Sequence, residues 1–144
     1  MNVFFDTSAI VKLFSVEPGT EEVEKIINEA NNEIWLLELA ETELLSAVYR
    51  KLRNNEIARQ KINQIRKEIS LQMKWFNMIP LNSEILREAN RLVAEYGLDF
   101  GIRTLDALHI GGWLSVADTE WLFVTADKVQ AELVKRIGFK VYTV

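Results

Sequence analysis

The chain begins with NVFFDTSAI (residues 2–10), in which an apolar segment leads into a helix through a single aspartate. Residues 2–5 are typical of a short buried strand, and the oxygens of Asp6, Thr7 and Ser8 are suited to cap the helix that follows. The same order, a strand and then a helix, recurs at residues 34–53 and 121–136. This alternation indicates βαβ units with right-handed crossovers and a mostly parallel sheet covered on both faces.

The remaining segments fit the same pattern of alternating strands and helices. We expect Ser83 to cap one helix and Gly97 to end it, because a glycine adopts positive φ at little cost. A loop is expected to follow at residues 98–102. The predicted strands cover residues 2–5, 34–37, 76–81, 121–125 and 139–144, and the predicted helices cover residues 9–14, 20–32, 40–53, 56–74, 83–96, 103–116 and 128–136.

The composition limits both the size of the core and the kinds of site. A chain of 144 residues is the size of one domain, so residues 1–144 are expected to share a single core. With no cysteine and one histidine, thiolate and multi-histidine metal sites are excluded. The longest apolar runs span only a few residues, and no signal peptide is recognisable, so we expect a cytoplasmic protein without a membrane segment.

Charge is distributed unevenly along the chain. The formal net charge is −4, yet the segment from Arg50 to Lys67 carries seven basic residues against Glu56 alone. A locally basic helical segment indicates a polyanionic partner or a protein partner, and an ordinary solvated face is the competing interpretation. Its basic residues are Arg50, Lys51, Arg53, Arg59, Lys61, Arg66 and Lys67.

Four acidic residues stand at positions where carboxylates are unusual. Asp6 and Asp127 each follow a predicted strand, so both are expected at the carboxyl edge of the sheet, where open parallel sheets bind ligands. Each could serve only as a helix cap, and Gln130 completes a capping-box pattern with Asp127. Asp106 shares a helix stripe with Ile110, and pairing with Arg103 is the purely structural alternative.

Periodicity alone does not identify the fourth acid. Glu43 has small and apolar neighbours at helical spacing, but Glu41 has a comparable environment, so the pattern does not choose between them. Four converging carboxylates would raise one another's pKa values or require a cation, and oxygen ligands favour Mg²⁺ or Mn²⁺ over zinc. The sequence therefore predicts a divalent metal site.

Four segments together resemble a PIN domain, and more narrowly the VapC-type toxins of toxin–antitoxin pairs. They are VFFDTSAI (3–10), TELLSA (42–47), TLDALHI (104–110) and FVTAD (123–127), and the resemblance covers nearly the whole chain. It implies a three-layer α/β/α fold with a central, mostly parallel sheet of four to five strands. It also implies that the catalytic and metal-binding acids are Asp6, Glu43, Asp106 and Asp127, and so selects Glu43 over Glu41.

The resemblance further implies an Mg²⁺-dependent endoribonuclease that acts as the toxin of a type II toxin–antitoxin system. RNA would be the substrate, a cognate antitoxin the partner, and a homodimer the usual assembly. Hydrolysis would leave a 5′-phosphate and a 3′-hydroxyl. The alternatives are a non-catalytic PIN-like module that binds RNA or protein, and phosphoryl transfer through a strand-end aspartate, which the absence of an Asp-x-Asp pair and of a glycine-rich phosphate loop disfavours.

Several other residues are expected to support the four acids or to hold the RNA. Thr7, Ser8 and Thr125 match hydroxyl positions that would orient carboxylates or water, and His109 is expected to be a packing or supporting residue. Because an acidic pocket repels RNA, positive charge must hold the backbone elsewhere. Candidates for that contact are Arg50, Lys51, Arg53, Arg59, Lys61 and Arg103. The tryptophans Trp35, Trp75, Trp113 and Trp121 are expected in the core rather than stacked on bases.

Overall fold

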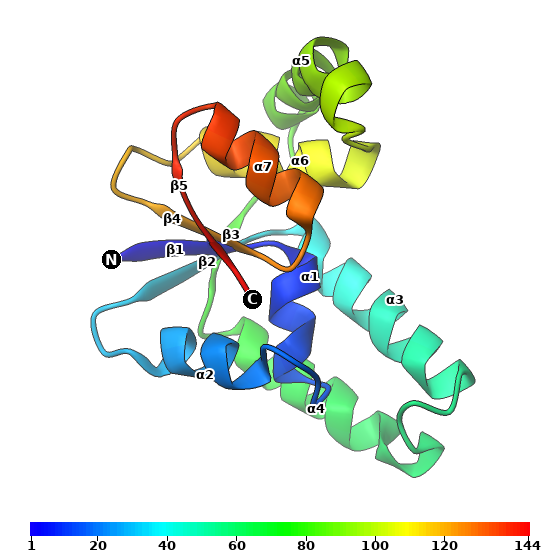
Figure 1. Cartoon of the computed structure of the whole chain (residues 1–144). Helices are drawn as coiled ribbons and strands as arrows, with labels where there is room; N and C mark the ends of the chain where they lie inside the picture. The colour runs from blue at the N-terminus through cyan, green and yellow to red at the C-terminus, as the bar shows by residue number, and fades with distance from the viewer.

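The computed structural model describes residues 1–144, and its centre is a five-stranded sheet (Figure 1). All neighbouring strands pair in parallel, in the order β3-β2-β1-β4-β5. The predicted α/β class with a parallel sheet is therefore confirmed. The direction of winding reverses between β1 and β4, and in such sheets ligands bind beyond the carboxyl ends of the strands at that point. The strands are β1 (Asn2–Phe5), β2 (Glu33–Leu37), β3 (Asn77–Ile79), β4 (Leu122–Thr125) and β5 (Lys140–Thr143).

Helices cover both faces of the sheet and give three layers (Figure 1). On one face lie α1, the short 3₁₀ turn η1, α2, α3 and α4, and on the other lie α5, α6 and α7. The helical elements are α1 (Thr7–Ile10), η1 (Val11–Leu13), α2 (Thr20–Asn28), α3 (Leu39–Arg53), η2 (Arg59–Lys61), α4 (Ile62–Met73), α5 (Ser83–Phe100), α6 (Thr104–Leu114) and α7 (Lys128–Arg136).

Two apolar clusters form the core, one on each face of the sheet. Alternate residues of a strand point to opposite faces, so Val3 and Phe5 join the first cluster while Phe4 joins the second. All three side chains are fully buried, as expected for a parallel sheet covered on both sides. The rigid sheet fixes the position at which the residue following β1 emerges.

The basic segment forms an arm of two helices, α3 and α4, at the side of the molecule (Figure 1). The predicted second helix begins later than expected, at Ile62 rather than Glu56. Asn55 has a positive φ of 59°, and the backbone N–H of Glu56 donates to the carbonyl of Lys51, so residues 54–58 form a turn that breaks the helix.

The helix α5 begins at Ser83, where the predicted helix begins, but its capping residue and its end differ from the prediction. Asn82, not Ser83, is the N-cap, and its side chain accepts hydrogen bonds from the backbone N–H groups of Glu84 and Ile85. The helix continues through Gly97 to Phe100 and ends at Gly101, whose φ is 68°. A second glycine four residues on therefore provides the left-handed cap that we expected of Gly97.

The tryptophans follow the core prediction with one exception. Trp113 and Trp121 are buried, and Trp35 is partly buried against Trp121. Trp75 is 82% exposed because it lies in the turn that follows α4, so its prediction as a core residue was wrong. None of the helices combines the length and apolar composition needed to cross a lipid bilayer.

Candidate functional site

Asp6 follows β1 directly and is almost completely buried, with 1% of its surface exposed. Its backbone N–H donates to the carbonyl of Val124 at 3.1 Å, which continues the pairing of β1 with β4. The carboxylate accepts hydrogen bonds from the Ser8 hydroxyl at 2.8 Å and from the backbone N–H of Ala9 at 3.1 Å. Asp6 therefore caps α1, as predicted, and the same carboxylate stands at the carboxyl edge of the sheet.

The end of β4 brings a second aspartate to this edge. Thr125 is fully buried, and its hydroxyl accepts the backbone N–H of Asp127 at 2.9 Å and lies 3.3 Å from the Ser8 hydroxyl. The Asp127 carboxylate caps α7 by accepting the backbone N–H groups of Val129 and Gln130 at 2.7 and 3.0 Å. The hydroxyls predicted beside the acids therefore link the ends of β1 and β4.

Asp106 comes from the first turn of α6. Its carboxylate accepts the backbone N–H of Arg103 at 3.2 Å, and its side chain is 15% exposed. The Arg103 guanidinium lies 4.0 Å from the same carboxylate but is 86% exposed. The pairing considered as a structural alternative is therefore a loose surface contact, which contributes little stability in water.

Glu43 reaches the site from α3 and is held by two partners. The Thr7 hydroxyl donates to its Oε1 atom at 2.8 Å, and Nε2 of the buried His109 lies 2.5 Å from the same oxygen. The imidazole also contacts the ring of Phe4 edge-on, consistent with the packing role predicted for it. The rival candidate Glu41 is exposed and does not line the pocket, so the structure brings Glu43 and not Glu41 to the other acids.

Gln130 of α7 connects two of the acids, a role that the sequence analysis missed. Its Nε2 atom donates to Asp6 Oδ2 at 2.8 Å and to Asp106 Oδ1 at 3.2 Å. The only sequence signal was its place three residues after Asp127, which predicted a capping box. The backbone N–H that a capping glutamine would bind is instead taken by Thr125.

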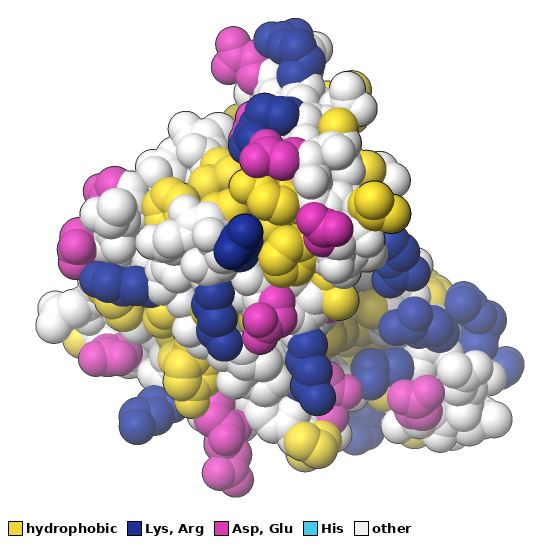
Figure 2. Space-filling model, turned by 45° about the horizontal axis from the view of Figure 1, so that its top comes forward, with side chains coloured by type: hydrophobic (Ala, Val, Ile, Leu, Met, Phe, Trp, Pro, Cys, Tyr) yellow, Lys and Arg dark blue, Asp and Glu magenta, His cyan; other side chains and the backbone are white.

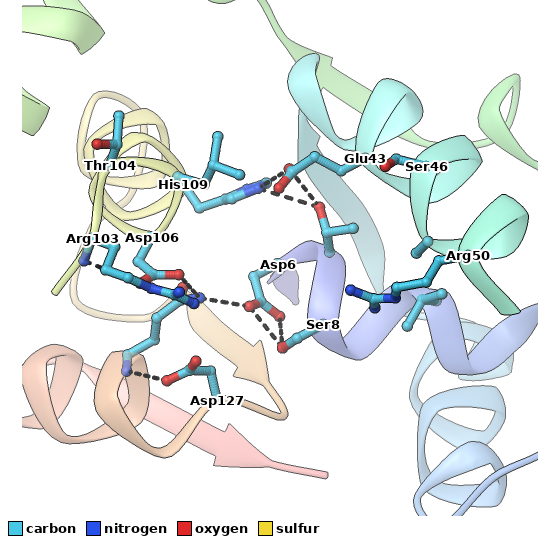
Figure 3. A pocket seen from close by; sticks show the side chains of 15 residues that line it. Asp6, Ser8, Glu43, Ser46, Arg50, Arg103, Thr104, Asp106, His109 and Asp127 are labelled. Atoms are coloured by element: carbon cyan, nitrogen blue, oxygen red, sulfur yellow. Dashed lines mark hydrogen bonds and ion pairs between the residues drawn. The ribbon is translucent and has the colours of Figure 1, made fainter. Parts of the chain in front are cut away.

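These residues surround one cavity of about 550 Å³ at the carboxyl end of the sheet. Figure 3 shows the carboxylates of Asp6, Glu43, Asp106 and Asp127 arranged around it, with the Arg50 guanidinium directed toward it from α3. The four acids come from four separate segments of the chain, and the fold alone makes them neighbours. Their catalytic and metal-binding roles stay predictions at this point.

The electrostatics of the cavity disfavour negative charge. Burial raises the pKa of Asp6 above its usual range, and the neighbouring His109 and the hydrogen bonds from Ser8 and Ala9 oppose that rise. Burial also raises the pKa of Asp106, against the hydrogen bond from the Arg103 backbone. The nearby charge of Asp127 adds to the rise for Asp106. A bound cation would favour the ionised form of both groups.

The donor set fits a hard divalent cation, because it consists of carboxylate oxygens and a single imidazole. No three of these side chains stand close enough together to coordinate one ion directly in this arrangement. Mg²⁺ does not require such a cage, since it usually keeps several waters and is held through one or two carboxylates. The cavity is large enough for an ion with its hydration shell.

The basic side chains predicted to bind RNA lie near the cavity or along the α3–α4 arm. Figure 2 shows lysine and arginine gathered on the side of the molecule where this arm lies. Arg50 and Arg103 line the cavity, and Arg53, Arg59 and Lys61 are exposed along the arm. Lys51 differs, because its ammonium group lies 2.8 Å from Glu17 and 3.5 Å from Glu56 and its side chain is only 15% exposed. It is held in a local ion-pair network, so its prediction as an RNA contact is not supported.

One family model matches this chain, and the solved structures that resemble it share its fold. The PIN domain family model matches residues 3–135. A chain in the crystal structure of VapBC2 from Rickettsia felis, bound to a DNA fragment from their promoter, superimposes with a TM-score of 0.68 at 16% identity, covering 100% of this chain and 99% of that chain. A chain of a toxin–antitoxin complex from Klebsiella pneumoniae gives a TM-score of 0.67 at 15% identity, with 99% of both chains covered.

PAE2754 from Pyrobaculum aerophilum gives a TM-score of 0.64 at 20% identity, covering 98% of this chain and 89% of that chain. At such identities the structural likeness shows the fold alone. Sequence comparison with curated proteins gives no significant match.

Proposed function

The chain belongs to the PIN domain family, and from that premise we propose that it is a metal-dependent endoribonuclease that hydrolyses phosphodiester bonds in RNA with Mg²⁺ or Mn²⁺. The observation that supports this most strongly is the convergence of Asp6, Glu43, Asp106 and Asp127 on one cavity. Asp6 is buried there without an arginine or lysine in contact. Apart from capping α1, a carboxylate buried in this way has little structural purpose, and a cation would stabilise its negative charge.

Asp6 and Asp106 are the side chains we propose to hold the ion, directly or through water, because they face each other across Gln130. Asp127 and Glu43 would complete the set or orient water. When bound, the ion would supply a water of lowered pKa and would polarise the phosphoryl oxygen. Hydroxyl groups already fix the acids, since Ser8 donates to both oxygens of Asp6.

Glu43 is the residue we propose to orient the attacking water. Both of its protein partners, Thr7 and His109, bind the same atom, Oε1, so Oε2 carries no protein hydrogen bond and is left to accept one from water. Water would add to phosphorus, the bond to the 3′ oxygen would break, and the departing oxygen would take up a proton. The expected products carry a 5′-phosphate and a 3′-hydroxyl.

RNA binding would depend on positive charge at the rim of the acidic cavity. Arg50 and Arg103 line opposite sides of it, so the backbone would be held where cleavage occurs. Arg53, Arg59 and Lys61 would extend this contact along the arm. Contacts of this kind position a nucleic acid without reading its sequence.

We also propose that the protein acts as a VapC-type toxin with a cognate antitoxin as its partner, in the cytoplasm. Support comes from the shared fold with chains of the VapBC2 complex and of the Klebsiella pneumoniae toxin–antitoxin complex. Controlled expression should arrest growth, and coexpression of the adjacent reading frame should relieve the arrest. Growth that is unaffected by expression of a soluble, folded protein would contradict the toxin assignment.

A homodimer is the assembly we propose for the isolated protein. Leu86 and Val93 of α5 are exposed beside a shallow groove that is lined on its other side by Ala107 and Leu108 of α6. A second copy would remove this apolar surface from water. Light scattering should give about twice the mass of one chain, and a mass of one chain at all concentrations would contradict the dimer.

The decisive experiment compares purified wild type with Asp6→Asn on total bacterial RNA, with Mg²⁺ or EDTA. We expect cleavage by wild type with Mg²⁺ only, and a loss of at least about a hundredfold in Asp6→Asn because one ion ligand is removed. Asp99→Asn serves as the matched control, since Asp99 is exposed and lies outside the cavity. Equal cleavage by wild type and Asp6→Asn would refute the nuclease assignment, and RNA binding without any cleavage would favour a binding module.

A further inference from the structure

Gln130 occupies an unusual place among the residues of the cavity. It is 3% exposed, and its single amide nitrogen donates to carboxylates from two different parts of the fold. Asp6 follows β1, Asp106 belongs to α6, and Gln130 itself lies on α7. No other side chain in the structure hydrogen-bonds to both acids.

We propose that Gln130 is a positioning residue that organises the ion site before the ion arrives. Its two amide hydrogens hold Asp6 and Asp106 toward each other and offset part of their repulsion. This inference rests on the proposed function, because it concerns the two carboxylates assigned to the ion. Gln130 itself is not a catalytic residue, since it acts through the acids.

The orientation of the amide is set by the acids and not by the surrounding packing. Turning the amide over would place Oε1 against two carboxylate oxygens, with no proton between them. In the observed orientation both N–H groups are used, but Oε1 is buried without a partner. An unpaired buried carbonyl is unfavourable. A glutamine placed here only to fill space would have no reason to leave it so, and an apolar side chain would fill the space without that cost.

A local capping role does not account for this side chain either. In a capping box the glutamine would bind the backbone N–H of Asp127, but that group donates to the Thr125 hydroxyl at 2.9 Å. The side chain instead points from α7 into the cavity and contacts the two acids. Its partners are therefore the proposed ion ligands and not its own helix.

A neutral donor suits this position better than a charged one. A lysine would also bind both carboxylates, but its charge would cancel the negative potential that attracts a cation. An apolar residue would leave two partly desolvated carboxylates unbridged, and they would move apart or take up a proton. Glutamine holds the acids together and leaves their charge available.

The test measures Mn²⁺ affinity by isothermal titration calorimetry in wild type, Gln130→Met and Gln130→Lys, with circular dichroism to verify folding. Gln130→Met keeps the length of the side chain and removes the donors, so we expect about tenfold weaker Mn²⁺ binding. Gln130→Lys should raise the melting temperature in EDTA and weaken Mn²⁺ binding by at least about a hundredfold. A residue that acted only through packing would leave Mn²⁺ affinity unchanged in Gln130→Met, whatever the change in melting temperature.

Gln64→Leu is the matched control. The Gln64 amide donates to Glu68 at 2.9 Å on α4, away from the cavity, so its removal should leave Mn²⁺ affinity unchanged. If Gln130→Met binds Mn²⁺ as tightly as wild type, the inference is overturned while the proposed function stands. If Gln130→Met does not fold, Gln130→Lys takes its place. The inference is then overturned if Gln130→Lys binds Mn²⁺ as tightly as wild type does. Wild type that binds no Mn²⁺ at all would overturn the proposed function and this inference together.

Discussion

Replacing Asp6 with asparagine should destabilise the protein most at low pH, in protein freed of metal with EDTA, and the stability difference from wild type should shrink as the pH rises. The carboxylate is 1% exposed and accepts hydrogen bonds from Ser8, Ala9 and Gln130. Asparagine keeps one oxygen, which can still cap α1, but its NH₂ group brings two hydrogens, whereas the protonated carboxyl that the raised pKa favours at pH 4 has one. One buried donor left unpaired costs about 1–3 kcal/mol, so Asp6→Asn should be less stable than wild type by this amount at pH 4.

The pH dependence follows from the raised pKa of Asp6 in the folded protein. An unfolded chain ionises this group near a pKa of about 3.9, so between that value and the higher folded pKa the unfolded state releases the proton first. Wild-type stability therefore falls as the pH rises through this window, and the loss remains above it. Asp6→Asn has no such group, so the stability difference should shift toward the variant between pH 4 and pH 8.

Urea unfolding followed by tryptophan fluorescence measures this difference, because Trp113 is fully buried in the core. Mn²⁺ at one hundred times its Kd should stabilise wild type by about 2.7 kcal/mol, or roughly 5–10 °C in Tm for a chain of this size. Asp6→Asn should gain little. Parallel pH curves for wild type and variant in EDTA would show that Asp6 is not destabilised by burial, and the reasoning would fail.

Three further predictions concern other parts of the molecule. Arg50→Ala should weaken RNA binding and reduce the slope of log affinity against log salt concentration by about 1 in a fluorescence anisotropy titration, because Arg50 lines the cavity. Lys51→Ala should leave that slope unchanged and lower Tm instead, because Lys51 is held in ion pairs. Equal slopes for the two variants would contradict the assignment. Gly112→Ala should destabilise the fold by about 1–3 kcal/mol in urea unfolding, since a Cβ atom there would lie 2.7 Å from Leu37 Cδ1. A stability equal to wild type would show that the buried Leu37 side chain moves aside without cost. Glu43→Gln should keep a Tm close to that of wild type, because an amide oxygen still accepts hydrogen bonds from Thr7 and His109. The same variant should cleave RNA at least about tenfold more slowly. Retained cleavage would show that Glu43 does not orient the water.

The order of strands and helices could be predicted because it depends on local pattern. The segment at residues 2–10 shows a strand, an aspartate and a helix in the printed sequence, and the structure follows it closely. Boundaries were less predictable where two residues compete for one role. Gly97 and Gly101 are both able to end a helix. In the structure the helix continues between them, with Tyr96 packed against Phe100 and the Gly101 N–H bonded to the Gly97 carbonyl.

Contacts between distant segments were harder to predict than the acids themselves. Asp6 and Asp127 follow strands and Asp106 shares a helix stripe with Ile110, so three of the acids have a local signal. The local pattern did not distinguish Glu43 from Glu41. Gln130 has only a capping-box position as a local signal, and that signal pointed to the wrong partner, because its two partners are 124 and 24 residues away. Lys51 is a second example, in which a basic residue in a basic segment pairs with Glu17 from another part of the chain.

The position of the site follows from the topology and not from any single motif. Because the sheet reverses its winding between β1 and β4, no crossover helix fills the space above the carboxyl ends of these two strands, and the residues that follow them face an open cavity. Asp6 is buried at this point by its own cap and by α7, so a site that needs a desolvated carboxylate is obtained without a dedicated loop. The same burial destabilises the free protein, and the ion that would relieve it is the one that the proposed reaction needs. Variants of the proposed ion-holding residues Asp6 and Asp106 should therefore lose stabilisation by Mn²⁺ and RNA cleavage together, whereas Glu43→Gln should lose cleavage alone. An Asp6 or Asp106 variant that cleaves RNA without being stabilised by Mn²⁺ would contradict this coupling.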